Sequence, residues 1–194
     1  MSIDPRILIE RILEGDSSSA RALVDRFQGV VYAVCFRMLR HRQDAEDVTQ
    51  EVFFRVFRHL ASWDATRPFK PWLITIAVNR CRVALTKRTR TPTPSENIQH
   101  LTEPELPEEH GVLEEEIQLA LQSLREEYRT CFILYHQQEL SCSEIGEIID
   151  CPEGTVKTWL YRARKELAEW LKRRDLEHCS YSPSSNESDP QKRK

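Results

Sequence analysis

The sequence is poor in glycine and lacks the patterns of a β-rich or membrane protein. Only five of its 194 residues are glycine, and no stretch alternates convincingly between apolar and polar residues. No apolar run approaches the roughly 18 residues of a membrane span, and the first residues, MSIDPR, lack the apolar segment of a signal peptide. We therefore expect a helical, cytoplasmic protein with no membrane insertion.

The sequence also lacks the motifs of catalysis and of metal binding. It has no glycine-rich phosphate loop and no plausible nucleophile paired with a base, and its six cysteines form no CxxC pair. The alternative for some of these cysteines is a zinc site, for which the candidate ligands are Cys131, His136, Cys142 and Cys151. Their spacing matches no common zinc site, and cysteine is often simply a small buried residue. We expect no enzyme activity, no metal and no cofactor.

Helical periodicity is what the sequence has in abundance. Apolar residues recur at three- and four-residue spacing through the first 90 residues and again from 112 to 172. The expected fold class is all-α, with two small helical domains over residues 1–90 and 112–175. Residues 91–111 and 176–194 combine prolines, polar residues and charges that cannot bury enough surface to order themselves, which predicts a flexible linker and a disordered tail. Helices are expected over residues 4–14, 17–40, 43–60, 69–88, 112–123, 126–137, 142–149 and 153–172.

The net charge of −3 conceals basic segments on either side of an acidic one. Residues 79–90 contain five basic residues and no acidic one, and residues 151–174 carry a net charge of +4. Residues 95–127, between them, hold ten glutamates against one arginine. This arrangement indicates a polyanionic partner that contacts the chain at two places.

A helix-turn-helix motif is indicated around residue 150. Ser141 and Glu144 have the spacing of a capping box, which predicts a helix start. Pro152 fixes the backbone at the entrance of the next helix, and Gly146 lets the two helices approach closely. That next helix is expected to bury Val156, Leu160, Ala163, Leu167 and Leu171.

The opposite face of this helix, with its edges, is polar and basic. It comprises Thr155, Lys157, Thr158, Tyr161, Arg162, Arg164 and Lys165. Arginine can form a bidentate contact with guanine, lysine can contact phosphate or guanine, and threonine and tyrosine can contact phosphate or a thymine methyl. This face therefore suits the major groove of DNA. The alternative is a solvated helix face with i,i+4 ion pairs.

The helix over 43–60 is expected to expose an aromatic residue. Its outer face holds Asp47, Gln50, Glu51, Phe54 and Arg58. A phenylalanine among acids and an amide is typical of a protein interface, although a singly exposed aromatic residue is also normal.

The helix over 69–88 is expected to bury Ile74, Ala77, Val78, Cys81 and Leu85. Its outer face holds Trp72, Ile76, Asn79, Arg80, Val83 and Lys87. Because rings stack on bases while cations follow the backbone, this face suits unstacked bases. The alternative for Trp72 is half-burial against the preceding loop.

Three stretches carry a family resemblance when they are taken in order. They are DAEDVTQEVFFRVF at 44–57, PFKPWLITIAVNRCR at 68–82 and SEIGEIIDCPEGTVKTWLYRARKEL at 143–167. Together they resemble the extracytoplasmic-function (ECF) group of bacterial sigma factors, which give RNA polymerase its promoter specificity. The resemblance covers residues 5 to 172, with a poorly matching linker.

The resemblance implies three sets of contacting residues. The set implied to bind core RNA polymerase is Asp47, Gln50, Glu51 and Phe54. The set implied to capture flipped bases of the minus-ten element and help open the duplex is Trp63, Arg67, Trp72, Asn79, Arg80 and Arg82. The set implied to read the minus-thirty-five element is Thr155, Lys157, Thr158, Tyr161, Arg162 and Lys165. The implied partners are core polymerase, duplex and melted promoter DNA, and an anti-sigma factor.

Two residues depart from the family pattern. Trp159 stands where a cation is common, and its angle on the helix places it beside Trp170, which favours packing over a DNA contact. Gly146 replaces a usual alanine, which should cost about 1 kcal/mol in helix propensity unless tighter packing offsets it.

The resemblance implies a non-enzymatic initiation factor, and two other functions remain open. A helix-turn-helix regulator that binds duplex DNA without core polymerase would explain residues 140–172 equally well, but it leaves Phe54, Trp72 and Asn79 without a task. A pure interaction protein with solvated basic faces is the second alternative.

Overall fold

The computed structural model describes residues 3–90 and 108–180, and every regular element in these two ranges is a helix. The helices in chain order are α1 (Pro5–Leu13), α2 (Ser17–Leu39), α3 (Arg42–His59), the 3₁₀-helix η1 (Leu60–Ser62), α4 (Phe69–Arg90), α5 (Glu108–Ser123), α6 (Glu126–His136), α7 (Cys142–Ile149) and α8 (Glu153–Ser180). The prediction of an all-α fold is confirmed.

Helices α5 and α8 are longer than predicted, whereas the other helix ends lie within two residues of the prediction. Helix α5 begins at Glu108 instead of 112. Helix α8 continues to Ser180 instead of 172, through a segment rich in good helix formers. The other residues of the predicted linker and tail lie outside the described ranges.

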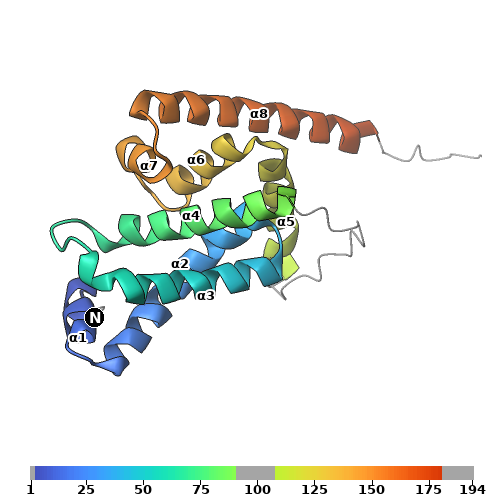
Figure 1. The fold of residues 1–194 in the computed structure, drawn as a ribbon. Helices are drawn as coiled ribbons and strands as arrows, with labels where there is room; N and C mark the ends of the chain where they lie inside the picture. The colour runs from blue at the N-terminus through green and yellow to red at the C-terminus, as the bar shows by residue number, and fades with distance from the viewer. Residues whose placement is uncertain (1–2, 91–107, 181–194) are drawn as a thin grey trace, which may run out of the picture.

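Helices α1 to α4 form an N-terminal bundle (Figure 1). Helix α2 supplies its centre, where Leu23, Val31 and Val34 are fully buried against α3 and α4. The periodicity predicts that α3 buries Ala45, Val48, Thr49, Val52, Phe53, Val56 and Leu60; all are buried except Thr49, which is half-buried. Helix α4 buries Ile74, Ala77, Val78 and Cys81 as predicted, whereas Leu85 is only half-buried. The opposite faces of α3 and α4 are thereby held outward and next to each other.

Helices α5 to α8 form a C-terminal bundle that contains the predicted helix-turn-helix. The capping box is present, because the Ser141 hydroxyl accepts the Glu144 backbone N–H at 3.2 Å and the Glu144 carboxylate accepts the Ser141 backbone N–H at 2.8 Å. Helix α7 ends at Asp150 in the left-handed conformation, with φ of 57°. A Cβ atom on Gly146 would lie 2.6 Å from the Cys151 carbonyl oxygen, so the tight turn requires glycine there.

Helix α8 packs on α6 and α7 through much of the predicted face. Val156, Leu160 and Ala163 are buried, and Leu167 is half-buried. The expectation that Leu171 is buried is wrong, because its side chain is 50% exposed. The C-terminal turns of α8 extend past α6 and α7 (Figure 1).

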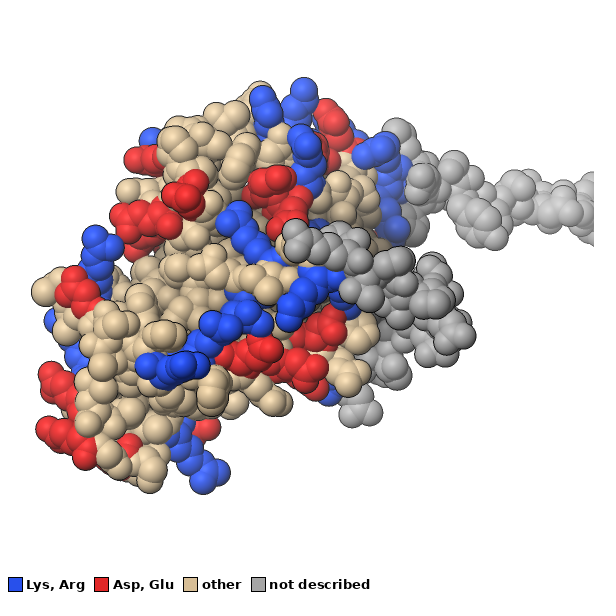
Figure 2. All heavy atoms as spheres, in the orientation of Figure 1, with Lys and Arg blue, Asp and Glu red and all other residues tan. Residues whose placement is uncertain are grey.

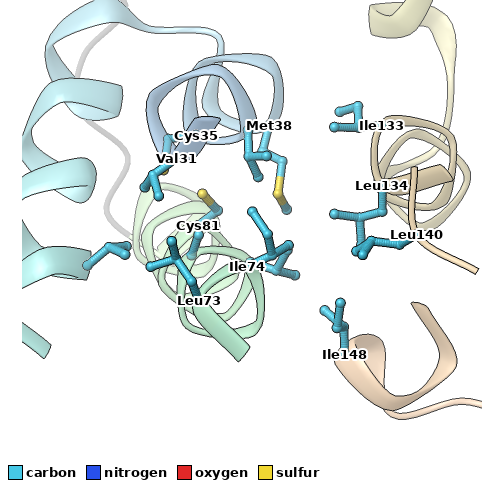
Figure 3. Close-up of a cluster of buried hydrophobic side chains, with 14 of the residues drawn as sticks. Val31, Cys35, Met38, Leu73, Ile74, Cys81, Ile133, Leu134, Leu140 and Ile148 are labelled. Carbon is cyan, nitrogen blue, oxygen red and sulfur yellow. The ribbon is translucent and has the colours of Figure 1, made fainter. Parts of the chain in front are cut away.

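The two bundles pack directly against each other. Helix α2 contacts α6, and helix α4 contacts α7. Figure 3 shows the contact: Met38 and Ile74 of the N-terminal bundle face Leu134, Leu140 and Ile148 of the C-terminal bundle. All five side chains are at most 5% exposed. The two predicted helical domains are therefore present, but they share one continuous apolar core.

Candidate interaction surfaces

The four residues predicted to bind core polymerase all lie on the exposed side of α3. Asp47, Gln50, Glu51 and Phe54 are exposed, and the Phe54 side chain is 69% exposed. Phe54 is set among polar groups on a rigid helix, because the opposite face of α3 is fixed in the core. We call this set the docking face. It presents one large apolar group to a partner.

An ion pair joins the docking face to α4. The Glu51 carboxylate accepts a hydrogen bond from the Arg80 guanidinium, whose side chain is only 15% exposed. Glu51 therefore contacts a residue of the minus-ten set as well as belonging to the docking face. Figure 2 shows a band of Lys and Arg side chains crossing this side of the molecule over α3 and α4, with acidic side chains below it.

A pocket of about 300 Å³ lies between α3 and α4, directly beside this ion pair. Trp72, Asn79 and Arg80 line it, as three of the predicted base-binding residues. Arg55 and His59 line the same pocket from α3. An indole ring, an amide and several cationic or hydrogen-bonding groups are together suited to a nucleobase and its phosphate. We call this pocket the base pocket.

Arg55 and His59 were missed by the sequence reasoning, which considered the outer face of α3 only around Phe54. Their signal was available, because Glu51, Arg55 and His59 follow one another at i,i+4 spacing and therefore lie on one side of a helix. The spacing does not show that this side of α3 faces α4.

The loop between η1 and α4 is held by its own side chains. Trp63 is half-buried, and its ring meets Phe69 edge to face at 5.6 Å between centroids. Phe69 also contacts Trp72 at 5.6 Å. Asp64 accepts hydrogen bonds from the Thr66 backbone N–H at 2.9 Å and hydroxyl at 2.7 Å, which lower the pKa of its carboxyl. The rings of Trp63 and Trp72 are therefore each packed partly on the core and exposed in part at the surface.

A second groove, of about 410 Å³, lies between the two bundles. Trp63, Arg67 and Trp72, which are predicted to contact the minus-ten element, line one side of it, and Glu144 and Glu147 of α7 line the other. Arg67 Nη1 lies 3.4 Å from Glu147 Oε2. We call this the interdomain groove. Trp72 lines both the groove and the base pocket, so the two cavities adjoin at this ring.

Five of the six predicted minus-ten residues lie at these two cavities, and Arg82 lies at neither. Asn79 and Arg80 lie at the base pocket, Trp63 and Arg67 lie at the interdomain groove, and Trp72 lies at both. Arg82 is close enough to Cys131 and Cys151 of the C-terminal bundle to lower the pKa of both thiols, although burial raises each of them overall.

The residues predicted to read duplex DNA extend along α8. Lys157, Thr158, Tyr161, Arg162 and Lys165 are exposed, with Tyr161 at 69%, and Thr155 is half-buried. We call these six the recognition face. The i,i+4 ion pairs of the alternative interpretation, a solvated helix face, are present in part. Lys157 Nζ lies 2.7 Å from Glu153 Oε1, and Lys165 Nζ lies 4.0 Å from Glu169 Oε1.

Arg162 has a partner on another helix. Its Nη1 donates to the Tyr128 hydroxyl at 3.0 Å, which raises the pKa of the guanidinium. The Tyr128 ring also packs on Trp159, at 6.5 Å between centroids. Trp159 therefore packs, as expected, but on Tyr128. Trp170 is eleven residues further on, or about 16 Å along the helix at 1.5 Å per residue.

Neither a membrane span nor a metal centre is visible where the chain is described. No helix in these ranges is long and apolar enough to cross a bilayer, and no group of three or more His, Cys, Asp and Glu side chains could hold a metal ion. Cys131, one of the alternative zinc ligands, is fully buried, and burial raises the pKa of its thiol to about 12. It behaves as a small buried residue.

The structure consists of a helix-turn-helix bundle joined to a second helical bundle, with a separate pocket between α3 and α4. Residues 23–91 match the family described as Sigma-70 region 2, and residues 114–167 match Sigma-70, region 4. The ECF RNA polymerase sigma factor SigW of Bacillus subtilis (strain 168) is 34% identical over 181 residues, which cover 87% of this chain and 96% of that protein. The chain belongs to the sigma-70 family, in its ECF group.

Other relatives and solved structures agree. The ECF RNA polymerase sigma-E factor of Escherichia coli (strain K12) is 34% identical over 175 residues, covering 84% of this chain and 91% of that one. CnrH in complex with the cytosolic domain of CnrY has a TM-score of 0.66 at 23% identity, covering 87% of this chain and 97% of that one. The sigma factor RpoE of Bartonella quintana, in complex with the anti-sigma factor NepR, has a TM-score of 0.64 at 23% identity, covering 78% and 96%. These two structures establish the shared fold.

Proposed function

We propose that this protein is a transcription initiation factor that binds core RNA polymerase, directs it to specific promoters and helps to melt the minus-ten element. Membership of the sigma-70 family favours this function over a duplex-binding regulator that works without polymerase. The observation that carries the proposal is the base pocket, in which Trp72, Asn79 and Arg80 converge beside an exposed docking face. A regulator that reads only duplex DNA needs no such pocket.

The base pocket is proposed to hold a base that has left the duplex. Trp72 offers a ring for stacking, and the Asn79 amide can both donate to and accept from a base edge. Arg80 and Arg55 supply positive charge for the adjoining phosphates. Trapping unstacked bases in this way offsets an unstacking cost of a few kcal/mol, so the energy for melting comes from binding.

The docking face is proposed to bind core polymerase, with Phe54 as its apolar centre. Glu51 has a further task, because its carboxylate holds Arg80 at the base pocket. A partner that covers α3 would therefore lie against the residues that face the melted strand. This proximity couples polymerase binding to strand capture in one small bundle.

The recognition face of α8 is proposed to read the minus-thirty-five element in the major groove. Arg162 is the best candidate for a bidentate base contact, because its bond to Tyr128 uses only one of the five N–H donors of a guanidinium. The lysines at 157 and 165 are proposed to contact phosphates, for which their exposed ammonium groups are suited.

The remaining parts of the proposal concern compartment and partners. We propose that the protein is not an enzyme and acts in the cytoplasm, where its polymerase partner transcribes. We also propose that an anti-sigma factor regulates it, since both CnrH and the Bartonella RpoE have been solved in complexes, the latter with a named anti-sigma factor.

In vitro transcription with purified core polymerase on a library of genomic fragments tests the function. We expect discrete transcripts that require both this protein and core polymerase. The control is the same protein with fragments in a filter-binding assay that omits polymerase. Tight, sequence-specific binding to duplex DNA without polymerase, together with no transcripts in its presence, would favour the duplex-binding regulator.

A further inference from the structure

Two arginine side chains come together where α2 of the N-terminal bundle meets α6 of the C-terminal bundle. Arg40 ends α2, and Arg129 lies on α6, which contacts α2. Arg40 follows Met38 by two residues, and Arg129 precedes Ile133 by one helical turn. Met38 and Ile133 are buried on the facing sides of these two helices (Figure 3). The charge of Arg129 is close enough to lower the pKa of Arg40. We call Arg40 and Arg129 the boundary arginines.

Both of these guanidinium groups are withdrawn from water. Arg129 is only 8% exposed, and Arg40 is half-buried. Burial is the main cause that lowers the pKa of each group, and the pKa of Arg40 falls to about 10. A guanidinium with this pKa is still charged at neutral pH. The boundary arginines therefore place two like charges in a partly dry environment, which is unfavourable unless an anion accompanies them.

The boundary arginines also have donors that nothing accepts. Nε and Nη2 of Arg40 and Nε of Arg129 are buried and have no hydrogen-bond partner among the described residues. Glu126 is close enough to raise the pKa of Arg129, but its side chain is exposed. Buried polar groups in folded proteins are nearly always hydrogen-bonded, to the protein, to water or to a bound ion. The three nitrogens therefore point to a ligand that accepts hydrogen bonds.

Other arginines near the end of α2 are paired differently. Arg42 Nε donates to Glu46 Oε1 at 3.0 Å, and the Arg88 guanidinium forms an ion pair with Asp44. Each of these cations has an acidic side chain of its own. The boundary arginines have none of this kind, although they are the more deeply buried.

We propose that the boundary arginines form a binding site for a small oxyanion with two negative charges, of the class of inorganic phosphate or the phosphate group of a small metabolite. The planar fork of a guanidinium matches the oxygens of a phosphate, and two cations balance its two charges. The burial of the donors favours a small ligand over a DNA backbone. Neither arginine belongs to the docking face, the base pocket or the recognition face, so the inference does not depend on the proposed function.

Thermal unfolding of the full-length protein tests the site. Far-UV circular dichroism follows unfolding in sodium phosphate and in sodium chloride at equal pH and ionic strength. Arg40→Met and Arg129→Met each keep an unbranched side chain but remove one charge. The control is Arg11→Met, which removes one charge from an exposed position on α1. A further series replaces inorganic phosphate with glycerol phosphate, which separates a free ion from the phosphate group of an ester.

Phosphate at ten times its dissociation constant should raise the Tm of the unmodified protein and of Arg11→Met by about 3 to 6 °C relative to chloride. Arg40→Met and Arg129→Met should lose this difference. Phosphate also stabilises proteins in general, so an equal difference in all four proteins would overturn the site. An effect of glycerol phosphate equal to that of phosphate would show room for an ester, and an effect of phosphate alone would indicate the free ion; either result supports the site.

The chloride series separates an anion site from a structural arginine. In chloride, Arg40→Met should have a Tm no lower than that of the unmodified protein, because it removes one of two repelling charges and two unpartnered nitrogens. A lower Tm in both salts, with the phosphate difference retained, would overturn the site.

Two further measurements apply if a methionine variant loses helix content. Arg129→Lys keeps the charge but loses the planar fork, so it should fold and show a smaller phosphate difference than the unmodified protein. Phosphorus NMR of the unmodified protein should show a broadened line for inorganic phosphate. An unbroadened line, or a full phosphate difference in Arg129→Lys, would contradict the proposed site.

Discussion

Gly146 determines the turn between α7 and α8 because it has no side chain. Family resemblance makes this glycine a departure that costs helix propensity, whereas the structure explains it, since a Cβ would lie 2.6 Å from the Cys151 carbonyl oxygen. Backbone oxygen cannot retreat as the end of a flexible side chain can. The turn between α7 and α8 therefore depends on the absence of a side chain at this position.

Gly146→Ala should destabilise the protein by about 1 to 3 kcal/mol, the usual cost of forcing an extra carbon into a packed site. The matched control is Gly29→Ala on α2, where a Cβ would meet nothing within 4 Å. That change should stabilise by about 0.5 to 1 kcal/mol through helix propensity. Urea unfolding followed by circular dichroism measures both. A neutral or stabilising Gly146→Ala would show that the turn can widen at no cost.

Phe54 is the large exposed apolar side chain of the docking face. Truncation of a central interface aromatic typically costs 2 kcal/mol or more in binding, so Phe54→Ala should weaken binding to core polymerase by at least that much without changing helix content. Gln50→Ala should also weaken it. Tyr161→Ala is the matched control, because Tyr161 is equally exposed at 69% but lies on α8. Titration of labelled protein with core polymerase gives the affinities, and unchanged values for both α3 variants would remove the docking face from the account.

At the scale of elements, the sequence predicts what each helix does with its own faces. The buried residues of α3 and α4 follow from their apolar period, and the capping box marks the start of α7. The period does not report which neighbour a face meets. For that reason Arg55 and His59 were missed at the base pocket, Leu171 was wrongly expected to be buried, and Trp159 was placed beside the wrong aromatic ring.

Arg162 is exposed on the recognition face of α8. Arg162→Ala should weaken binding of the polymerase complex to promoter DNA by about fivefold to a hundredfold, the range for loss of a bidentate base contact, and the loss should shrink when the minus-thirty-five element is altered. Lys172→Ala, which removes one charge further along α8, is the control. Gel-shift titration on both promoters gives the affinities. Equal losses for the two variants on every sequence would mean that Arg162 contributes charge and not base recognition.

At the scale of the whole molecule, the two bundles and their order along the chain were predictable, but their packing against each other was not. Met38, Ile74 and Leu140 read as ordinary apolar positions, because core residues and residues between bundles have the same composition and period. The proline-rich segment between residues 90 and 108 favoured separate domains, and a long connection permits either arrangement. Only the three-dimensional structure distinguishes an apolar face that packs within its own bundle from one that packs against the other bundle.

Strand opening at a promoter tests the central claim, that the N-terminal bundle holds the melted minus-ten strand. The variant is Asn79→Ala, since Asn79 is exposed and lines the base pocket. A substitution of Trp63 is less suitable, because Trp63 packs on Phe69 and its loss would change stability as well as strand binding. The control is Val83→Ala, one turn along α4 and 41% exposed. With core polymerase present, permanganate reactivity of unpaired thymines reports opening, and gel-shift affinity reports initial binding. We predict that Asn79→Ala binds the promoter nearly as well as the unmodified protein but opens it more slowly, and that Val83→Ala does both normally. Opening by Asn79→Ala at the unmodified rate would contradict the account.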